Sequence, residues 1–238
     1  MIVFDTLIRI LKKTVLLFFM VLLSNAVFAR DSEERVIKSF DDIRVTGRME
    51  VRLEEGKKER LRIEAEGIEI SKVFTEHSGG TLKIYIQRGF LKEDIDVKVY
   101  VTYTKLREIH SSALASIKGK SIIKGDKLVV DVNSNGKAEL KIDVSTIDLT
   151  VSSSGELDIS GRTETQNTRV NTGGKLKAFD LDCDNTYIRV NTTGTGEVRA
   201  NKLLEATVNT AGNLRIKGSP AEETIKSGAG GTVTRLVD

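Results

Sequence analysis

One short segment of the chain places three carboxylates at alternate positions. Asp180, Asp182 and Asp184 could ligate Ca²⁺ or accept hydrogen bonds from the hydroxyl groups of a sugar. A calcium-binding EF-hand loop needs a glycine at its sixth position and a glutamate at its twelfth, where this chain has Asn185 and Asn191. This mismatch favours a solvated turn, and the sequence predicts neither a metal site nor a cofactor.

Two histidines, His77 and His110, are the other side chains suited to metal binding or proton transfer. They are isolated in the sequence, so neither suggests a metal pair or a catalytic triad. His77 is followed by Ser-Gly-Gly, which is typical of a surface turn. Two acids on neighbouring repeats could hydrolyse a glycosidic bond, but the sequence singles out no such pair. We therefore predict no catalytic residue, and an enzyme that acts on polysaccharide remains the alternative.

Asparagine and threonine recur at equal offsets in the C-terminal half of the chain. If the repeats stack in register, the asparagines could form a ladder of side-chain hydrogen bonds, and the threonines could order water or bind the hydroxyl groups of a glycan. Turn residues must also satisfy their own backbone groups, which favours a structural role. The asparagines are Asn133, Asn171, Asn191 and Asn209, and the threonines are Thr172, Thr192 and Thr210.

These residues belong to a repeat of 18 to 20 residues that contains a glycine turn. The turn glycines are Gly136, Gly155, Gly174, Gly194, Gly212 and Gly230. A period near twenty built from short β-type segments predicts a solenoid, in which each unit buries its apolar face against its neighbours. At Gly155 and Gly174 we expect either a positive φ or close packing as the reason for glycine.

One repeat shows what each coil contains. Ile147, Leu149 and Val151 alternate with polar residues, and the alternation resumes after the glycine with Leu157 and Ile159. This period of two predicts two strands that share one inward face. Asn-Gly and Asp-Gly pairs, the favoured hairpin turns, are rare in the repeats, so a parallel β-helix is predicted in preference to a hairpin meander.

The N-terminus is typical of an export signal. Basic residues precede an apolar run over 14–23, and Ala29 ends a stretch suited to signal peptidase. The run is too short to favour an uncleaved membrane anchor. We therefore predict a signal peptide over 1–29, a linker over 30–39, an irregular β-rich part over 40–110 and regular solenoid repeats over 111–238.

The charge balance of the chain excludes one class of partner. Without residues 1–29 the chain has 34 basic and 33 acidic residues, and basic residues are not interleaved with aromatic ones. This balance gives no support to nucleic-acid binding. The only cysteine, Cys183, has no surroundings that would activate it as a nucleophile.

Three segments carry a resemblance to a known family. They are FDDIRVTG over Phe40–Gly47, VRLEEG over Val51–Gly56 and GTLKI over Gly80–Ile84, followed by the Ser-Ser-Gly-type turns. In this order they resemble the putative auto-transporter adhesin, head GIN domain family over about Phe40–Gly218. The resemblance implies an exported bacterial protein with two successive β-helical parts of the pectin-lyase kind and a role in adhesion.

The sequence therefore predicts an all-β, exported cell-envelope protein that acts as an adhesin or interaction scaffold through its extended surface. Its expected partner is a host or cell-surface glycan or protein. The mature protein is not expected to span a membrane. We expect it in the periplasm, on the cell surface or secreted, and either a monomer or a homo-oligomer is compatible with the sequence. A periplasmic factor in envelope stress or signalling is a further alternative.

Overall fold

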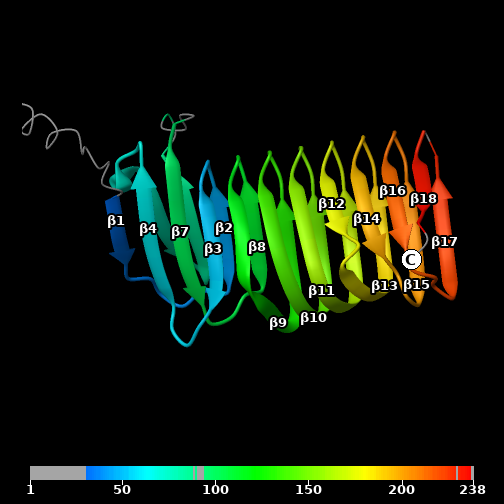
Figure 1. Cartoon of the computed structure of the whole chain (residues 1–238), viewed down its shortest axis with the longest axis horizontal. Coiled ribbons are helices and arrows are strands. Elements are labelled where there is room, and N and C mark those ends of the chain that lie inside the picture. Colours follow the sequence, from blue (N-terminus) through cyan, green and yellow to red (C-terminus); the bar gives the residue numbers. More distant parts are fainter. Residues whose placement is uncertain (1–30, 88, 90–93, 229, 237–238) are drawn as a thin grey trace, which may run out of the picture. The chain divides into compact units, whose positions relative to one another are not determined.

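The computed structural model describes residues 31–87, 89, 94–228 and 230–236 of the 238-residue chain. The predicted signal peptide over 1–29 lies outside the described residues. From residue 31 onward the chain forms one unit that consists almost entirely of β-strands (Figure 1). Among the described residues, no helix has the length and hydropathy that a membrane span requires.

The strands follow one another along the chain with a single short 3₁₀ helix, η1 (Ile70–Lys72), among them. They are β1 (Asp31–Arg35), β2 (Asp42–Thr46), β3 (Glu50–Glu55), β4 (Arg60–Glu66), β5 (Val73–Ser78), β6 (Thr81–Ile86), β7 (Asp96–Tyr103), β8 (Glu108–Ser112), β9 (Ser116–Val132), β10 (Lys137–Val151), β11 (Glu156–Val170), β12 (Lys175–Ala178), β13 (Leu181–Val190), β14 (Thr195–Arg199), β15 (Leu203–Val208), β16 (Asn213–Lys217), β17 (Glu222–Ser227) and β18 (Thr232–Arg235).

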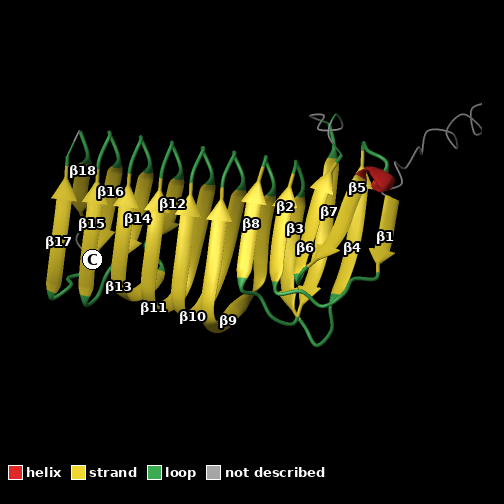
Figure 2. Ribbon diagram, turned by 180° about the vertical axis from the view of Figure 1, so that it is seen from behind, coloured by secondary structure: helices red, strands yellow, loops and turns green. Residues whose placement is uncertain are grey.

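From β8 onward the strands pair in parallel with the next coil of the chain, so the predicted parallel β-solenoid is confirmed. Two ladders run along the stack, one behind the other in Figure 2, and they face each other across the core. We call the ladder that contains the strands leading into the tight turns the front face. It includes β8, the ends of β9, β10 and β11, then β13, β15 and β17. The other ladder, the back face, includes the starts of β9, β10 and β11, then β12, β14, β16 and β18.

Apolar side chains from both faces point inward and fill the space between the ladders. Val132, Val151, Val170, Val190 and Val208 face one another in register, and each is 0% exposed. The valines that precede the turns therefore occupy equivalent inward positions in successive coils. This continuous row arises because the strand period of two repeats in register with the coil length.

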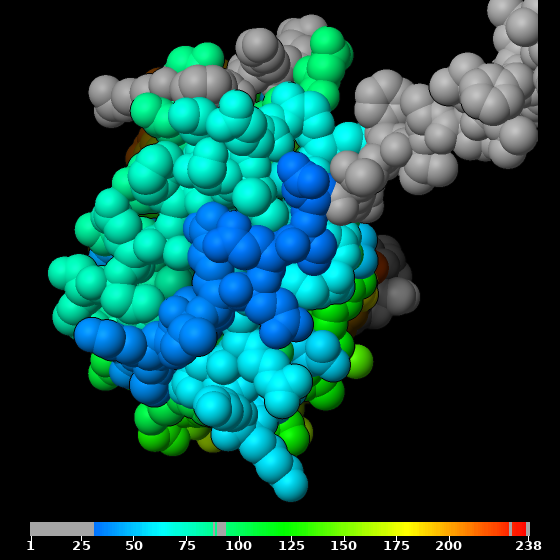
Figure 3. Space-filling model, turned by 90° about the vertical axis from the view of Figure 1, so that its left-hand side faces the viewer, coloured from blue at the N-terminus to red at the C-terminus, as the bar shows by residue number. Residues whose placement is uncertain are grey.

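The first coils are stacked in an order that differs from their order in the chain. The coil formed by β2 and β3 pairs with β6 and β7 on one side and with β8 and β9 on the other. The end of the stack is closed by antiparallel pairing of β4 with β7, of β1 with β4 and of β5 with β6. Figure 3 views this end, where the blue residues of β1 lie against the cyan residues of β4.

The segment over 30–39, predicted as a linker, contains β1. β1 pairs with β4, and its Arg35 donates hydrogen bonds to the carbonyl oxygens of Ile70 in η1 and Val73 in β5. The sequence did not predict this strand because its residues are polar. An edge strand has one face open to solvent and therefore does not require alternating apolar residues. The predicted boundary between residues 110 and 111 falls inside β8, and the division of the chain at this point stays a prediction.

Candidate functional site

The turns at one edge of the solenoid share one geometry. In the turn from Ser152 to Gly155, Ser153 and Ser154 have φ values of 48° and 61°, and the Gly155 N–H donates to the Ser152 carbonyl oxygen over 2.8 Å. Two central residues with positive φ and this hydrogen bond define a type I′ turn. Gly155 itself has no positive φ; a Cβ atom there would lie 2.3 Å from the carbonyl oxygen of Val132 in the preceding coil.

The other predicted turn glycines lie in equivalent turns, with one shift in the last coil. There Gly231, whose N–H donates to the Gly228 carbonyl oxygen, takes the fourth position of the turn, and Gly230 has a φ of 77° at the third. Successive turns are also linked, because the N–H of Ser154 donates to the carbonyl oxygen of Thr172 and the N–H of Gly173 donates to that of Thr192. The glycines thus allow close stacking of neighbouring coils.

The asparagines of the predicted polar ladder occupy the first position of these turns. Asn191 Nδ2 donates to Asn171 Oδ1 over 3.4 Å, whereas Asn133 Nδ2 donates to Asp131 Oδ1 within its own coil over 2.6 Å. Ser152 occupies the equivalent position between Asn133 and Asn171. The asparagines therefore do not all bond to one another: Asn191 bonds to the preceding coil, whereas Asn133 bonds within its own. Thr172, Thr192 and Thr210 lie exposed at the second position of the turns.

The side chains of two of the three alternating aspartates pair with residues of the next coil. Asp182 Oδ1 accepts a hydrogen bond from Asn201, and Asp184 Oδ2 lies 2.9 Å from Lys202 Nζ. Asp180 precedes β13, and its carbonyl oxygen accepts from the N–H of Gly161. Within the described part of the chain, no group of three or more His, Cys, Asp or Glu side chains is arranged to hold a metal ion.

The structure places the two histidines on separate strands. His110 Nε2 lies 3.2 Å from Glu108 Oε2 on β8. His77 lies on β5 with its ring against Phe40, at a centroid distance of 6.2 Å. Burial lowers the pKa of His77, and the nearby positive charge of Lys38 adds to this effect. Neither arrangement resembles a catalytic triad.

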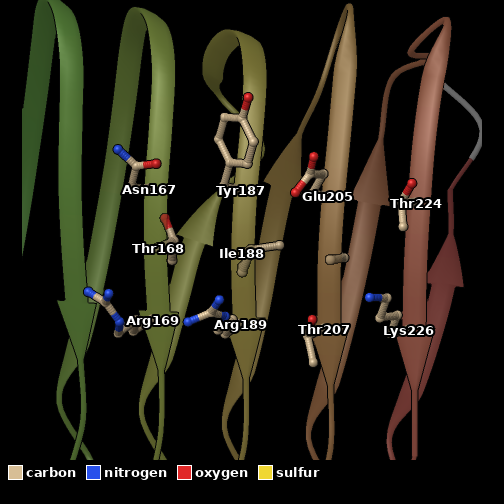
Figure 4. Close-up of a pocket in the computed structure, with 11 residues that line it drawn as sticks. Asn167, Thr168, Arg169, Tyr187, Ile188, Arg189, Glu205, Thr207, Thr224 and Lys226 are labelled. Atoms are coloured by element: carbon tan, nitrogen blue, oxygen red, sulfur yellow. The ribbon is translucent and has the colours of Figure 1, made fainter.

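The front face carries a shallow groove over its C-terminal coils that sequence reasoning missed. We call it the Tyr187 groove; its volume is about 390 Å³, and the outward side chains of β11, β13, β15 and β17 line it (Figure 4). Thr168, Ile188 and Ala206 lie along its floor and are 4%, 2% and 3% exposed, so their side chains face the core. The groove is therefore shaped by two rows of outward side chains.

The first row across the groove is cationic. In register along it lie Arg169, Arg189, Thr207 and Lys226. Among the described residues, none of these three cations has a carboxylate oxygen within 4.0 Å. Like charges that face each other on neighbouring strands destabilise a sheet, so Arg169 opposite Arg189 is a cost to folding.

The second row combines an aromatic ring with hydrogen-bonding groups. It consists of Asn167, Tyr187, Glu205 and Thr224, and the Tyr187 side chain is 37% exposed. Figure 4 shows the Tyr187 ring and the Glu205 carboxylate on adjacent strands above the cationic row. Asn167 Nδ2 donates to Asp148 Oδ1 over 2.9 Å at the border of the groove.

Asp148 is the nearest acid on the neighbouring coil, and it is already paired. Burial raises its pKa, but hydrogen bonds from Lys127 and Asn167 outweigh burial and hold the pKa below the ordinary value; Arg169 adds a weaker effect. Lys127 Nζ lies 2.6 Å from Asp148 Oδ2. Asp148 thus leaves the charge of the arginine pair largely available to a ligand.

Several charged side chains on the back face form ion pairs between coils. On the back face, Lys137 Nζ lies 3.0 Å from Glu156 Oε2 and Lys118 Nζ lies 2.7 Å from Glu50 Oε2. These charges therefore pair across coils, and charged side chains of this kind discourage edge aggregation. The arginine pair of the Tyr187 groove departs from this pattern.

A second groove lies at the opposite end of the front face. It has a volume of about 650 Å³ and is lined in part by Arg44, Phe74 and Tyr85. The rings of Phe74 and Tyr85 stack at 5.3 Å, but the Tyr85 hydroxyl donates to Glu76 and Arg44 pairs with Glu108. Arg44 and the Tyr85 hydroxyl are already partnered, so Lys83 is the one cation of this lining without an ion pair among the described residues, and this groove is the weaker candidate for an anionic ligand.

The family model described as "Putative auto-transporter adhesin, head GIN domain" matches residues 39–220. Among solved structures, a putative adhesin from Bacteroides fragilis is similar at 15% identity, with a TM-score of 0.78 over 87% of this chain and 96% of its own. A putative adhesin from Parabacteroides merdae is similar at 21% identity, with a TM-score of 0.68 over 87% and 95% of the two chains. A putative lipid binding protein from Parabacteroides distasonis has 21% identity and a TM-score of 0.66 over 87% and 96%. None of the curated proteins compared with the chain matches it.

Proposed function

The chain belongs to the putative auto-transporter adhesin, head GIN domain family, and from this membership we propose that it is an exported cell-envelope adhesin or interaction scaffold. Its partner binds along the outer surface of the solenoid, and the Tyr187 groove is the principal contact. The mature protein is held in the periplasm or at the cell surface.

One observation carries this proposal: the front face presents an arginine pair and an exposed tyrosine in an open groove, and among the described residues neither arginine has a carboxylate oxygen within 4.0 Å. Groups left unpaired at a cost to folding are typical of a binding surface. Glycoside hydrolysis would need two carboxyl groups across one scissile bond, and Glu205 is the only carboxylate among the residues that line this groove. The geometry therefore supports binding in preference to turnover.

The proposal is tested by measuring binding of the purified protein to whole cells and to immobilised glycans, while polysaccharide cleavage is assayed in parallel. Saturable binding without cleavage supports an adhesin or scaffold. Reproducible cleavage that is abolished by replacing one acidic residue would overturn it, because loss of a general acid lowers turnover by orders of magnitude.

A separate experiment tests the location. Cell fractionation combined with protease treatment of intact cells distinguishes a surface protein, which is digested, from a protected periplasmic one. Recovery of the protein in the cytoplasm only, with residues 1–29 still attached, would contradict export.

A further inference from the structure

We propose that the Tyr187 groove binds an acidic sugar, whose carboxylate is held between Arg169 and Arg189 while its ring packs on Tyr187. This inference rests on the proposed function and specifies its ligand. It is built from three features of the groove: the charge of one row, the aromatic ring of the other, and the acidic group beside that ring.

The arginine pair supplies the anion site. Arg169 and Arg189 are directly opposite in the parallel pairing of β11 and β13, so their Cα atoms are about 4.8 Å apart, the spacing between neighbouring strands. Each guanidinium is a planar fork that matches a carboxylate with two parallel hydrogen bonds. A carboxylate between them would remove the repulsion of the two like charges, so ligand binding relieves a cost that the free protein carries.

Tyr187 supplies the surface on which a ring can pack. It is the residue before Ile188 on β13 and lies two positions from Arg189 on the same outward side of the strand. Tyr187 is 37% exposed, and Figure 4 shows its ring projecting from β13 with the hydroxyl at the far end from the arginine row. An aromatic face of this kind binds the apolar side of a ligand while its hydroxyl group stays hydrated.

Glu205 favours an acidic sugar over a ligand with closely spaced negative charges, such as a row of phosphates. It lies directly opposite Tyr187 in the pairing of β13 with β15. A row of phosphates along the groove would meet this carboxylate, and like charges in contact raise the free energy of binding. A sugar ring with one carboxylate and several hydroxyl groups can instead donate hydrogen bonds to the Glu205 carboxylate. Its hydroxyl groups can also bond to the side-chain hydroxyls of Thr207 and Thr224.

The cationic row extends past the arginine pair to Lys226, which lies on β17 beyond Thr207. The groove therefore has space for more than one sugar unit across four neighbouring strands. A polysaccharide with repeated carboxylates could contact both the arginine pair and Lys226, and several weak contacts of this kind increase avidity.

The experiment uses oligogalacturonate and sialyllactose as acidic probes, with methyl-esterified oligogalacturonate and lactose as their neutral counterparts. We expect the purified protein to bind at least one acidic probe and to bind its neutral counterpart at least about tenfold more weakly, the effect of losing one hydrogen-bonded charge. The two acidic probes distinguish a uronic acid from a sialic acid as the preferred source of the carboxylate.

Variants locate the site. Arg169→Gln, Arg189→Gln and Tyr187→Ala should each weaken binding of the acidic probe, with a loss of about tenfold or more for each arginine. Lys141→Gln on the back face removes the same charge from an exposed position and should leave binding unchanged. Tyr85→Ala is the matched control for Tyr187→Ala, because Tyr85 lies in the second groove. All variants should unfold at the temperature of the native protein within a few degrees.

Three outcomes would overturn the inference: equal binding of acidic and neutral probes, unchanged binding by Arg169→Gln and Arg189→Gln, or tighter binding of DNA or anionic phospholipid vesicles than of both acidic sugars. Failure of the inference can be told from failure of the proposed function. If the protein binds cells and Arg189→Gln binds them equally well, the adhesin role stands and the ligand assignment to this groove is wrong.

Discussion

Gly155 lies directly against the main chain of Val132 in the preceding coil. A Cβ atom at Gly155 would be 2.3 Å from the carbonyl oxygen of Val132, closer than any side-chain atom can approach. The same contact joins Gly174 to Val151 at 2.4 Å and Gly212 to Val190 at 2.8 Å. The glycine period in the sequence therefore reflects the closeness of neighbouring turns.

Replacing Gly155 with alanine should destabilise the protein by about 2–4 kcal/mol, because the main chain of two coils must separate to admit the methyl group. Denaturant unfolding followed by circular dichroism measures the effect. Gly173→Asn is the control: Gly173 has a φ of 71°, which asparagine tolerates, and its nearest neighbour to a Cβ is Ser154 Oγ at 3.6 Å. Equal stability of Gly155→Ala and the native protein would contradict the contact.

Val170→Asp should destabilise the protein by several kcal/mol, because it places an unpaired carboxylate in the middle of the buried valine row. Arg169→Gln, one position earlier and facing outward, should leave the free energy of unfolding nearly unchanged or raise it slightly by removing repulsion from Arg189. Thermal unfolding of the two variants compares them. A Val170→Asp variant that melts with the native protein would show that the side chain does not face the core.

The turn from Asn191 to Gly194 offers a stabilising substitution. Thr192 and Thr193 have φ values of 49° and 58°, a region that β-branched residues rarely adopt. Replacing them with Asn-Gly, the preferred pair for a type I′ turn, should raise the free energy of unfolding by about 1–2 kcal/mol. The same pair at Ser153 and Ser154 should give a smaller gain, because serine is not β-branched. A loss of stability at Thr192 and Thr193 would mean that their side chains make contacts worth more than the relieved strain.

Stability should depend on pH through His77. Its pKa in the folded protein lies below the ordinary 6.5 because burial disfavours the charged form, and among the described residues no hydrogen-bond partner reaches its Nε2. The unfolded chain therefore takes up a proton first as pH falls, so stability is full above about pH 6.5 and decreases as pH drops through that value toward the folded pKa. Unfolding measured between pH 8 and pH 5 should show this loss, and His77→Phe should reduce it. An unchanged pH profile in His77→Phe would assign the dependence to other groups.

The regular coils could be predicted because the same residue type occupies the same structural position in successive repeats. Valine before the turn fills the core row and glycine after it admits the neighbouring main chain, so both recur with the coil length. The reason for glycine could not be read from the sequence, since positive φ and close approach select the same residue. In this protein the positive φ values belong to the two residues before it, such as Ser153 and Ser154.

The Tyr187 groove could not be predicted in the same way. Asn167, Tyr187, Glu205 and Thr224 are unlike residues, so they leave no repeat in the sequence even though they face one another in register. The arginine pair was in principle visible, because Arg169 and Arg189 precede equivalent valines. To recognise the arginine pair, one would have to align the outward-facing residues of successive repeats as well as the core residues.

The position of the β2–β3 coil between later coils has a consequence for the order of folding. Residues 42–55 gain neither neighbour until β6–β7 and β8–β9 are available, whereas each C-terminal coil needs only the coil next to it. Contacts between distant residues form slowly because a long loop must close first. We therefore expect the C-terminal coils to fold earlier and the N-terminal closure to complete the molecule. In a chain delivered N-terminus first, the β2–β3 coil would therefore wait for residues 81–119 before both of its neighbours are present.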